Sequence, residues 1–404
     1  MLPLNIDSPP GKRRRFLVEA SQAEARAGIL TTSHGVVKTP AFMPVATHGA
    51  VRTMTPSETT ATGASILLSN AYHIALRPGV ALVESLGGLH AFMGWSGPIL
   101  TDSGGFQIYS LGNLSRVTEE ALLFKSYLDG SSQRLSPEDA IRAQQELGSD
   151  IAMVLDHCTG YGADNKTLRE AMLRTHRWAC RSLEAHNRAD QAIFGIVQGG
   201  HNLRLREESA AAIIALGFDG HAVGGLSVGE PKELLYKVAA HTVRLLPLDK
   251  PRYLMGSGAP EDLVEAGAFG FDLFDCARPT RVARTGAIYT NRGRYDITSA
   301  KYREAAGPLE EECDCSTCSD FTTAYVAHLF RARELLAYRL ATIHNLRFYQ
   351  RLVARMRVAI IAGNFDDFRQ QFHSGFTPAN EGARLEQRKH WVRRNIDVPE
   401  KNSQ

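Results

Sequence analysis

The sequence predicts an α/β fold, a (β/α)8 TIM barrel that carries an N-terminal β-hairpin lid and a C-terminal helical subdomain. Short apolar runs alternate with helical stretches between residues 41 and 275. Most of these runs are apolar throughout, as expected of strands that are buried on both faces of a parallel sheet. Eight such strand–helix units in one chain indicate a closed barrel. The 404 residues are enough for one barrel with additions at both ends.

The predicted strands are short segments in which apolar residues follow one another almost without interruption. They are Ala41–Val45, Ser65–Ser69, Pro98–Thr101, Ile151–Leu155, Ala192–Val197, Ala222–Gly224, Arg252–Met255 and Phe271–Phe274. Amphipathic helices are predicted between the later strands, at Asn165–Ala185, Leu203–Leu216, Lys232–Leu245 and Glu261–Ala266. The spacing of their apolar positions would place one face of each helix on the sheet.

Three segments lie outside this repeating pattern. Arg26–Pro40 alternates around His34-Gly35 and predicts the β-hairpin lid, and residues 107–135 form an insertion after the third strand. Two long helices are predicted after residue 285. There Leu329, Leu336, Leu340 and Ile343 recur at helical spacing and are expected to pack in a core. We place the barrel and its N-terminal extension in residues 1–285, and the helical subdomain that completes the barrel in residues 286–404.

The charge of the chain is nearly balanced, with 46 basic and 43 acidic residues, and does not by itself identify a nucleic-acid-binding protein. Basic residues are nevertheless concentrated at 12–15, 278–294 and 384–394. The middle group is a candidate phosphate-binding patch, whereas a solvated surface explains the terminal groups equally well. No apolar run approaches the roughly 20 residues that span a bilayer, and no secretion signal is recognisable. A cytoplasmic protein is therefore expected.

Three cysteines, Cys313, Cys315 and Cys318, lie within six positions, and His344 follows after a long apolar stretch. Thiolate and imidazole are the ligands that zinc prefers, and four of them complete a tetrahedral shell. The pattern predicts one structural zinc ion per chain, which joins the cysteine loop to the helix of His344 and takes no part in chemistry. A disulfide pair with a spare thiol is the alternative interpretation, and His328 is the alternative fourth ligand.

Carboxylates follow several of the predicted strands. The reacting groups of a TIM barrel lie at the carboxyl ends of its strands, and by this rule Asp102, Asp156 and Asp275 converge with Gln198 on one mouth. A single aspartate at a strand end often caps the next helix, but three beside glycine pairs are harder to explain in that way. Two carboxylates that face one sugar support retaining glycosyl transfer, in which one attacks the anomeric carbon and the other moves protons.

A planar ligand is predicted beside these carboxylates. The glycine pairs that follow the third, fifth and sixth strands would let a ring lie close to backbone N–H and C=O groups. Phe106 and Met255 are candidates to sandwich the ring, and a glutamine with an aspartate suits the amide-like edge of guanine. The residues by themselves therefore predict a glycosyl-transferring barrel that acts on a purine-like base.

Several motifs of the chain resemble those of the tRNA-guanine transglycosylases, in that family's order, from about residue 14 to residue 375. They are Thr101-Asp102-Ser103-Gly104-Gly105-Phe106-Gln107, Gln198-Gly199-Gly200, Gly224-Gly225-Leu226, Tyr253-Leu254-Met255-Gly256, Phe274-Asp275-Cys276 with Pro279-Thr280-Arg281, and the cysteine–histidine set.

The resemblance implies exchange of guanine for a 7-deazaguanine base at the wobble position of tRNAs with a GUN anticodon, in queuosine biosynthesis. These are the tRNAs for aspartate, asparagine, histidine and tyrosine. Asp275 would attack the anomeric carbon and form a covalent ribosyl-enzyme, and Asp102 would take the proton of the incoming base. No ATP or redox cofactor is needed, because one N-glycosidic bond replaces another. A homodimer is expected as well.

The resemblance also implies the remaining site residues. Glu230 would steady the peptide whose carbonyl, that of Leu226, meets the 7-substituent. The residues implied at the base are Ser103, Phe106, Asp156, Gln198, Gly225, Leu226 and Met255, and those implied at the anticodon loop are Thr280, Arg281 and Arg284.

The identity of the incoming base is the finest of these expectations. Val45 and Cys158 agree with the form of the family that takes 7-aminomethyl-7-deazaguanine, and a variant that salvages queuine is the alternative. The chain departs from the usual bacterial pattern at Ala46-Thr47-His48, Phe106, His157 and Ala277-Arg278.

Three other functions are alternatives. A non-catalytic tRNA-binding partner subunit would lack the nucleophile. A transglycosylase could act on DNA or on another tRNA position. A plain glycoside hydrolase barrel predicts no zinc-binding tail.

Overall fold

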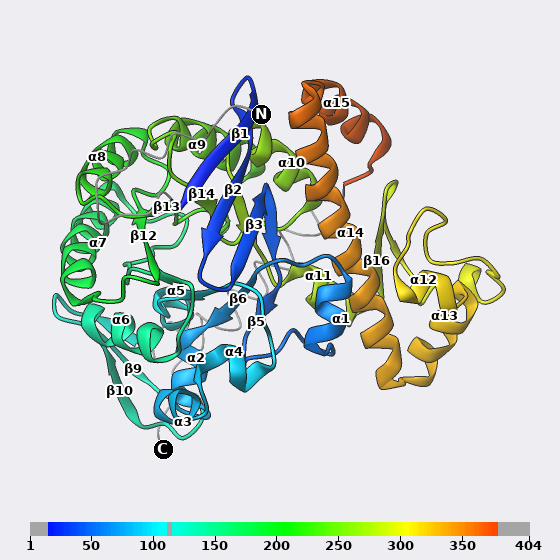
Figure 1. Cartoon of the computed structure of the whole chain (residues 1–404), viewed down its shortest axis with the longest axis horizontal. Helices are drawn as coiled ribbons and strands as arrows, with labels where there is room; N and C mark the ends of the chain where they lie inside the picture. Colours follow the sequence, from blue (N-terminus) through cyan, green and yellow to red (C-terminus); the bar gives the residue numbers. More distant parts are fainter. Residues whose placement is uncertain (1–14, 111–114, 379–404) are drawn as a thin grey trace, which may run out of the picture.

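The protein is described by a computed structural model of residues 15–110 and 115–378 (Figure 1). Its centre is a parallel sheet with the strand order β4-β15-β14-β13-β12-β11-β7-β6-β5. β4 (Ala41–Met43) and β5 (Val45–Ala46) are two halves of one segment, interrupted at Pro44. β4 pairs with β15 and β5 pairs with β6, so this segment joins the two edges of the sheet and closes the barrel.

The predicted barrel is confirmed, and the strand boundaries differ from the predicted ones by at most two residues. The remaining strands are β6 (Leu67–Asn70), β7 (Ile99–Asp102), β11 (Ile151–Met153), β12 (Ala192–Val197), β13 (Gly220–Val223), β14 (Arg252–Leu254) and β15 (Leu273–Asp275). Nearly all of their side chains are buried, because the inner face packs in the barrel and the outer face lies under helices.

The helices predicted between the later strands are also confirmed. They are α7 (Asn165–Ala185), α8 (Leu203–Ala215), α9 (Lys232–Arg244) and α10 (Pro260–Ala268), and they surround the sheet (Figure 1). α7 begins where the Asp164 side chain accepts the N–H of Thr167, which satisfies one of the free donors of the first turn. The earlier units contain α1 (Pro56–Ala61), α2 (Ala71–Leu76), α3 (Val80–Ser85), α4 (Gly88–Met93), α5 (Gly105–Tyr109) and α6 (Pro137–Glu146).

The predicted hairpin lid belongs to a three-stranded antiparallel sheet, β1 (Phe16–Gln22), β2 (Ala25–Thr32) and β3 (Gly35–Thr39). This sheet covers the amino ends of the barrel strands. Arg26 forms a buried ion pair with Asp272, which directly precedes β15, and its Nη1 donates to the Leu248 carbonyl ahead of β14 at 2.7 Å. The sheet therefore seals the end opposite to the one where barrel chemistry takes place.

Asp150, which directly precedes β11, anchors this sheet. Its carboxylate accepts the backbone N–H groups of His34 and Ile99 at 3.0 and 2.9 Å. It also contacts the rings of His34 and His90 at 2.9 and 3.1 Å. Two imidazoles and a carboxylate are potential metal ligands. Here, however, the rings stack with their centroids 3.5 Å apart, and each directs a nitrogen at a different oxygen. We assign the group a structural role.

The insertion after the third strand contains a second antiparallel sheet, β8 (Ser115–Val117), β9 (Leu122–Lys125) and β10 (Ser132–Leu135). It lies beside the mouth of the barrel, since β9 packs against α5, the short helix that follows β7. The ring of Phe124 in β9 lies 5.4 Å from the ring of Tyr72 in α2. The insertion thus supports the loops that follow β6 and β7.

The C-terminal elements are arranged around one long helix, α14 (Leu335–Ala362), where two long helices were predicted. It packs against β1, β2, β4, α1 and α10, so it extends along one side of the barrel (Figure 1). It also contacts most of the neighbouring C-terminal elements. These elements are α11 (Arg278–Ala283), β16 (Ala287–Thr290), β17 (Gly293–Asp296), α12 (Ser316–Asp320), α13 (Thr323–Ala332) and α15 (Phe365–Gly375).

The apolar pattern before His344 was predicted as one core-facing set, and this is wrong for one residue. Leu329, Leu340 and Ile343 are buried, but Leu336 is 38% exposed. The helix is interrupted at Arg333, whose φ of 59° is left-handed. The break separates Leu329 in α13 from Leu336, which lies in the first turn of α14.

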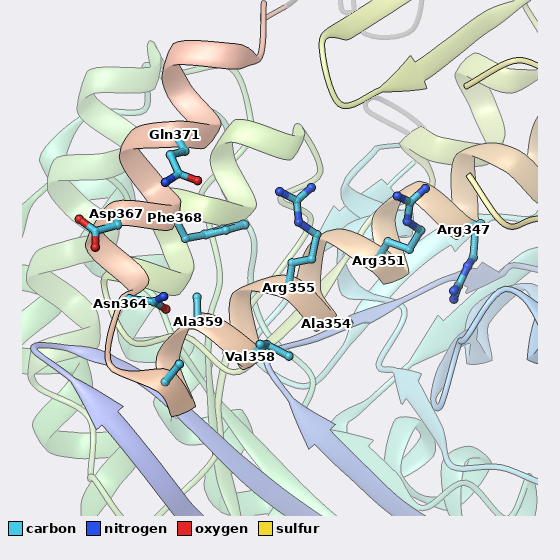
Figure 2. Close-up of a pocket in the computed structure, with 11 residues that line it drawn as sticks. Arg347, Arg351, Ala354, Arg355, Val358, Ala359, Asn364, Asp367, Phe368 and Gln371 are labelled. Atoms are coloured by element: carbon cyan, nitrogen blue, oxygen red, sulfur yellow. The ribbon is translucent and has the colours of Figure 1, made fainter. Parts of the chain in front are cut away.

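A surface groove of about 460 Å³ lies between α14 and α15 (Figure 2). Ala354, Val358, Ala359 and three arginines of α14 line it. Each arginine contacts a side chain of the C-terminal elements, and the groove contains no strand end. It is therefore not the candidate active site. The partners are Asp314 for Arg347, Glu310 for Arg351, and Asn291 with the Phe368 ring for Arg355.

The basic groups at residues 12–14 and 384–394 lie outside the described residues. Among the helices of the described part, none is both long and apolar enough to cross a membrane.

The Asp150 anchor generates a stability prediction. Burial by itself raises the pKa of this carboxyl, but the bonds from His90, Ile99 and His34 outweigh burial and hold the pKa at about 2, below the usual 3.8. The stabilisation is therefore complete above pH 4 and is lost as the pH falls towards 2. Asp150→Asn should lower the free energy of unfolding by about 2 kcal/mol at pH 6 and by less at pH 3.

Urea unfolding between pH 3 and pH 6 measures this difference. Asp249→Asn, in an exposed loop at the same end of the barrel, is the control and should change little. An equal loss at both pH values would contradict the anchoring role of the charge.

Candidate active site

The carboxyl ends of the strands bring the predicted polar residues together at one mouth of the barrel. Asp102 and Asp275 are the last residues of β7 and β15, Gln198 directly follows β12, and Asp156 lies three residues beyond β11. Asp102, Asp156 and Gln198 are buried, whereas Asp275 is partly exposed. These four residues come from distant parts of the sequence and share one site only because the barrel closes.

Asp102 is held by three N–H donors. Its Oδ2 accepts the amide groups of Asn70 and Gln107, the latter at 2.7 Å, and its Oδ1 accepts the N–H of Ala71 at 3.1 Å. Burial raises the pKa of Asp102 to about 7, because it outweighs these three bonds and is assisted by the negative charge of Asp275. A carboxyl with this pKa can both donate and accept a proton at neutral pH.

Asp275 faces the same space from the other side. Its Oδ1 accepts the hydroxyl of Tyr253 at 2.6 Å and the N–H of Gly256 at 2.8 Å. Gly256 has a left-handed φ of 70°, which favours glycine. No atom lies within 4 Å of the place that a Cβ would occupy, so a side chain would meet no steric clash there. Burial raises the pKa of Asp275, and the two hydrogen bonds oppose this effect. Both bonds are to Oδ1, so Oδ2 has no hydrogen-bond partner among the described residues.

Asp156 and Gln198 form a second polar pair. The Gln198 Nε2 donates to the Asp156 Oδ2 at 2.6 Å, and burial raises the pKa of Asp156 to about 6 against this bond. The glycines beside them provide the space. A Cβ on Gly105 would lie 2.8 Å from the Asp156 carbonyl, and a Cβ on Gly225 would lie 2.4 Å from the Gln198 Oε1. Glycines that were predicted to admit a ligand ring therefore also admit the polar side chains of the site.

Glu230 fixes the loop that follows β13. Its carboxylate accepts the N–H groups of Ser227, of Val228 at 2.9 Å and of Gly229 at 3.0 Å. The Ser227 N–H belongs to the peptide whose carbonyl is that of Leu226, so Glu230 lies behind this peptide as the resemblance implied. A small cavity beside the loop is lined in part by Gly200, Gly225, Leu226 and Glu230.

Positive charge accumulates beside Asp275. α11 carries Thr280 and Arg281, and Arg284 follows it and donates to the Thr280 carbonyl at 2.9 Å. Burial lowers the pKa of Arg284, and so do the charges of Arg52 and Arg281. Three guanidinium groups are thus close enough to repel one another at the rim, an arrangement that favours an anionic ligand.

The other predicted base-site residues lie around this mouth. Ser103 is buried directly after β7, Phe106 in α5 is 49% exposed, and Met255 follows β14 and is partly buried. Two of the residues that depart from the bacterial pattern contact neighbouring elements: His157 lies 3.1 Å from Arg174 of α7, and Arg278 donates to the hydroxyl of Tyr289 in β16 at 3.0 Å.

Reasoning from the sequence assigned no role to several residues that the structure brings into the site. Asn70 is the last residue of β6, so the strand-end rule would have found it had it been applied to the second strand. Tyr253 and Gln107 stand in the motifs, but only the tertiary structure shows their bonds to the two aspartates. Arg52 and Arg206 have no signal in the sequence.

The cysteine cluster lies between α12 and α14 and shares no residue with this mouth. Cys313, Cys315, Cys318 and His344 are buried, and their ligand atoms lie within 4.8 Å of one another. The His344 Nδ1 is 3.2 Å from the Cys318 sulfur and 3.8 Å from the Cys315 sulfur. Three thiols and one imidazole in this arrangement can hold a metal ion.

The structure also decides between the alternatives for this cluster. All three cysteines are free, so the disulfide interpretation is wrong. His328 is exposed on α13 and outside the cluster, so His344 is confirmed as its fourth member. The His344 Nε2 lies 2.7 Å from the Tyr289 carbonyl, a partner that orients the ring and leaves Nδ1 for a metal.

Comparison with known proteins gives consistent similarities over almost the whole chain. The family model described as "Queuine tRNA-ribosyltransferase" matches residues 21–378. Proteins named "Queuine tRNA-ribosyltransferase" are similar to the chain in several bacteria. The one from Dehalococcoides mccartyi (strain BAV1) is 48% identical over 373 residues, which are 92% of this chain and 95% of that protein. The one from Methylobacillus flagellatus is 51% identical over 360 residues, 89% and 97% of the two chains.

The cluster generates a metal-binding prediction. Cys318→Ser removes a thiolate ligand, so the purified variant should lose most of its bound metal and melt several degrees lower, because metal binding and folding are coupled. Elemental analysis and thermal melting measure the two effects. His344→Ala should behave in the same way, and His328→Ala is the control that should keep one metal ion per chain. Full metal content in Cys318→Ser would contradict the assignment.

Proposed function

The chain belongs to the queuine tRNA-ribosyltransferase family and is a tRNA-guanine transglycosylase, a pentosyltransferase, and we propose that it inserts 7-aminomethyl-7-deazaguanine through a covalent ribosyl-aspartate. The reaction replaces guanine at the wobble position of tRNAs with a GUN anticodon, as a step in queuosine biosynthesis. The observation that carries the proposal is the pair of aspartates at the mouth, Asp102 and Asp275, which are held by different donors and interact electrostatically.

Asp275 is the proposed nucleophile. Its Oδ2 attacks C1′ of the ribose while the C1′–N9 bond breaks and guanine leaves with the bonding electrons. The hydrogen bonds from Tyr253 and Gly256 to Oδ1 keep the carboxylate oriented and leave the second oxygen for the attack. An ester between ribose and enzyme conserves the glycosidic bond energy, so no activating nucleotide is required.

Asp102 is the proposed acid and base. It donates a proton to the departing guanine and takes one from N9 of the incoming base, which then attacks C1′ and releases Asp275. The proton balance of the whole exchange is zero. A pKa of about 7 suits both steps, because neither protonation state of Asp102 is strongly favoured at neutral pH.

The proposed base pocket is made of Ser103, Phe106, Met255 and the polar groups beyond Asp102. Asp156, Gln198 and the Gly225 N–H hold the edge of the base, and the Leu226 carbonyl accepts from the ammonium group of the 7-substituent. Burial raises the pKa of the Cys158 thiol, and the negative charges of Asp156 and Glu230 raise it further. That side chain therefore lies close to both groups and reduces the space for a larger substituent, which disfavours queuine.

Four further assignments belong to the proposal. Thr280, Arg281 and Arg284 contact the anticodon loop, and Arg52 adds a fourth contact there. The cysteine cluster holds one zinc ion, which is structural because four protein ligands fill its shell. Residues 286–404 form the zinc-binding subdomain beside a catalytic unit of residues 1–285, and the active protein is a homodimer.

The nucleophile assignment is tested with an anticodon stem-loop that carries guanine at the wobble position. Wild type should incorporate labelled guanine, and Asp275→Asn should not, because the amide lacks the charge that attacks. Binding of the stem-loop should be retained in the variant. The control is a stem-loop with adenine at the wobble position, which should give no exchange. A trapped adduct that maps to another carboxylate would reject Asp275 as the nucleophile.

The role of Asp102 predicts a pH dependence. The ionised carboxyl takes the proton of the incoming base, so kcat/KM for the base should fall as the pH decreases through about 7. Asn70→Ala removes a hydrogen-bond donor that favours the ionised form of Asp102. The pKa of Asp102 should rise, so the fall in kcat/KM should occur at a higher pH. Asp102→Asn should reduce exchange by about 10²–10⁴-fold or more. Near wild-type exchange in Asp102→Asn would mean that the residue only caps the following turn.

The choice of base is tested by steady-state competition. 7-Aminomethyl-7-deazaguanine should have a higher kcat/KM than queuine. Cys158→Gly removes a side chain from the proposed pocket wall. The ratio of kcat/KM for 7-aminomethyl-7-deazaguanine to kcat/KM for queuine should therefore fall about tenfold. Val45→Ala, a smaller change in β5, serves as the comparison. A higher kcat/KM for queuine in the wild type would make this a salvage enzyme.

A further inference from the structure

Arg206 is a fully buried arginine on α8 that the proposed reaction does not use. Its guanidinium group donates to three backbone carbonyls. Nε donates to Gly200 at 2.8 Å, and Nη1 donates to Val197 at 3.0 Å and to Gly224 at 2.8 Å. No solvent reaches this side chain, so its position depends on these acceptors.

The three carbonyls belong to the end of β12 and to the two loops that carry the proposed base edge. Val197 and Gly200 flank Gln198, and Gly224 precedes Gly225 and Leu226. Both loops contain left-handed residues, with φ of 55° at Gly200 and 66° at Gly225. One planar group with donors in fixed directions therefore determines where these two loops lie relative to each other.

The loop after β13 is held by opposite charges at its two ends. Arg206 binds the carbonyl at its start, and Glu230 binds the N–H groups of Ser227, Val228 and Gly229 at its end. Burial lowers the pKa of Arg206 to about 10, and the charge of Glu230 opposes this effect, so the guanidinium stays ionised at neutral pH. The residues between the two clamps are Gly225 and Leu226.

We propose that Arg206 is a positioning residue of the base pocket, which sets the spacing between the Gln198 loop and the Leu226 loop and thereby selects the incoming base without touching it. The assignment rests on the proposed function for the identity of the base. Gly225 supports the close fit, because a Cβ there would lie 2.4 Å from the Gln198 Oε1 and 3.5 Å from the Arg206 Nη2.

Arg252 offers a matched control at the other end of the barrel. It is also fully buried, and it donates to the backbone carbonyls of Leu246 at 2.7 Å and Pro247 at 3.2 Å, ahead of β14. Burial lowers its pKa to about 10 as well. A lysine at either position keeps the charge and loses the planar fork, so the two variants should lose similar stability while only one of them alters the pocket.

The test compares Arg206→Lys with Arg252→Lys by thermal melting and by exchange of labelled guanine into the stem-loop. Arg206→Lys should raise KM for the free base about tenfold or more and lower the preference for 7-aminomethyl-7-deazaguanine over guanine, with KM for the stem-loop changed less than about twofold. Arg252→Lys should leave both KM values and the preference unchanged. Equal KM shifts in both variants, or an unchanged base KM in Arg206→Lys, would overturn the proposal.

Ser209→Ala is a second variant that tests the same coupling with less risk to folding. The Ser209 hydroxyl, also on α8, accepts the N–H of Gln198 at 3.0 Å. Its removal should raise the base KM about two- to fivefold. If Arg206→Lys does not fold, an unchanged base KM in Ser209→Ala overturns the proposal. Absence of any exchange by the wild type would count against the proposed function. If the wild type exchanges guanine and Arg206→Lys keeps the wild-type base selectivity, only the positioning role is contradicted.

Discussion

Residues 41–46 pair with β15 on one side and with β6 on the other, and this pairing closes the barrel. The active site depends on it. Asp275 ends β15 and Asp102 ends β7, far apart along the chain, but around the ring they are separated only by this segment and β6. Closure brings the two carboxylates near enough for the charge of Asp275 to raise the pKa of Asp102. An open sheet would leave them at opposite edges.

An aspartate lies at each end of the barrel, and the two have opposite pKa shifts. At the mouth, burial outweighs three N–H donors and the neighbouring Asp275 opposes ionisation, so the pKa of Asp102 rises to about 7. At the sealed end, donors that include two imidazoles overcome burial, and the pKa of Asp150 falls to about 2. A carboxyl with a pKa near neutrality and a carboxyl that stays ionised are thus distinguished by their hydrogen-bond donors and neighbouring charges.

Buried polar groups also explain why the loops at the mouth keep their shape. Backbone carbonyls are satisfied by Arg206 and backbone N–H groups by Glu230, so strained glycine-rich loops are held without regular secondary structure. The cysteine cluster and α14 hold β16 through His344 and Asn345. These contacts join the C-terminal elements to the segment that carries Asp275 and α11.

The sequence by itself determined the strand positions, because strands buried on both faces must be apolar, and it located three of the four metal-ligand candidates, because those lie within one short loop. The strand-end rule located Asp102, Asp156 and Asp275. Only the tertiary structure decided between His344 and His328, showed that Leu336 is exposed, and revealed the hydrogen bonds of Asn70, Tyr253 and Arg206. Each of these depends on how segments distant in sequence pack together, and local composition carries no information about that packing.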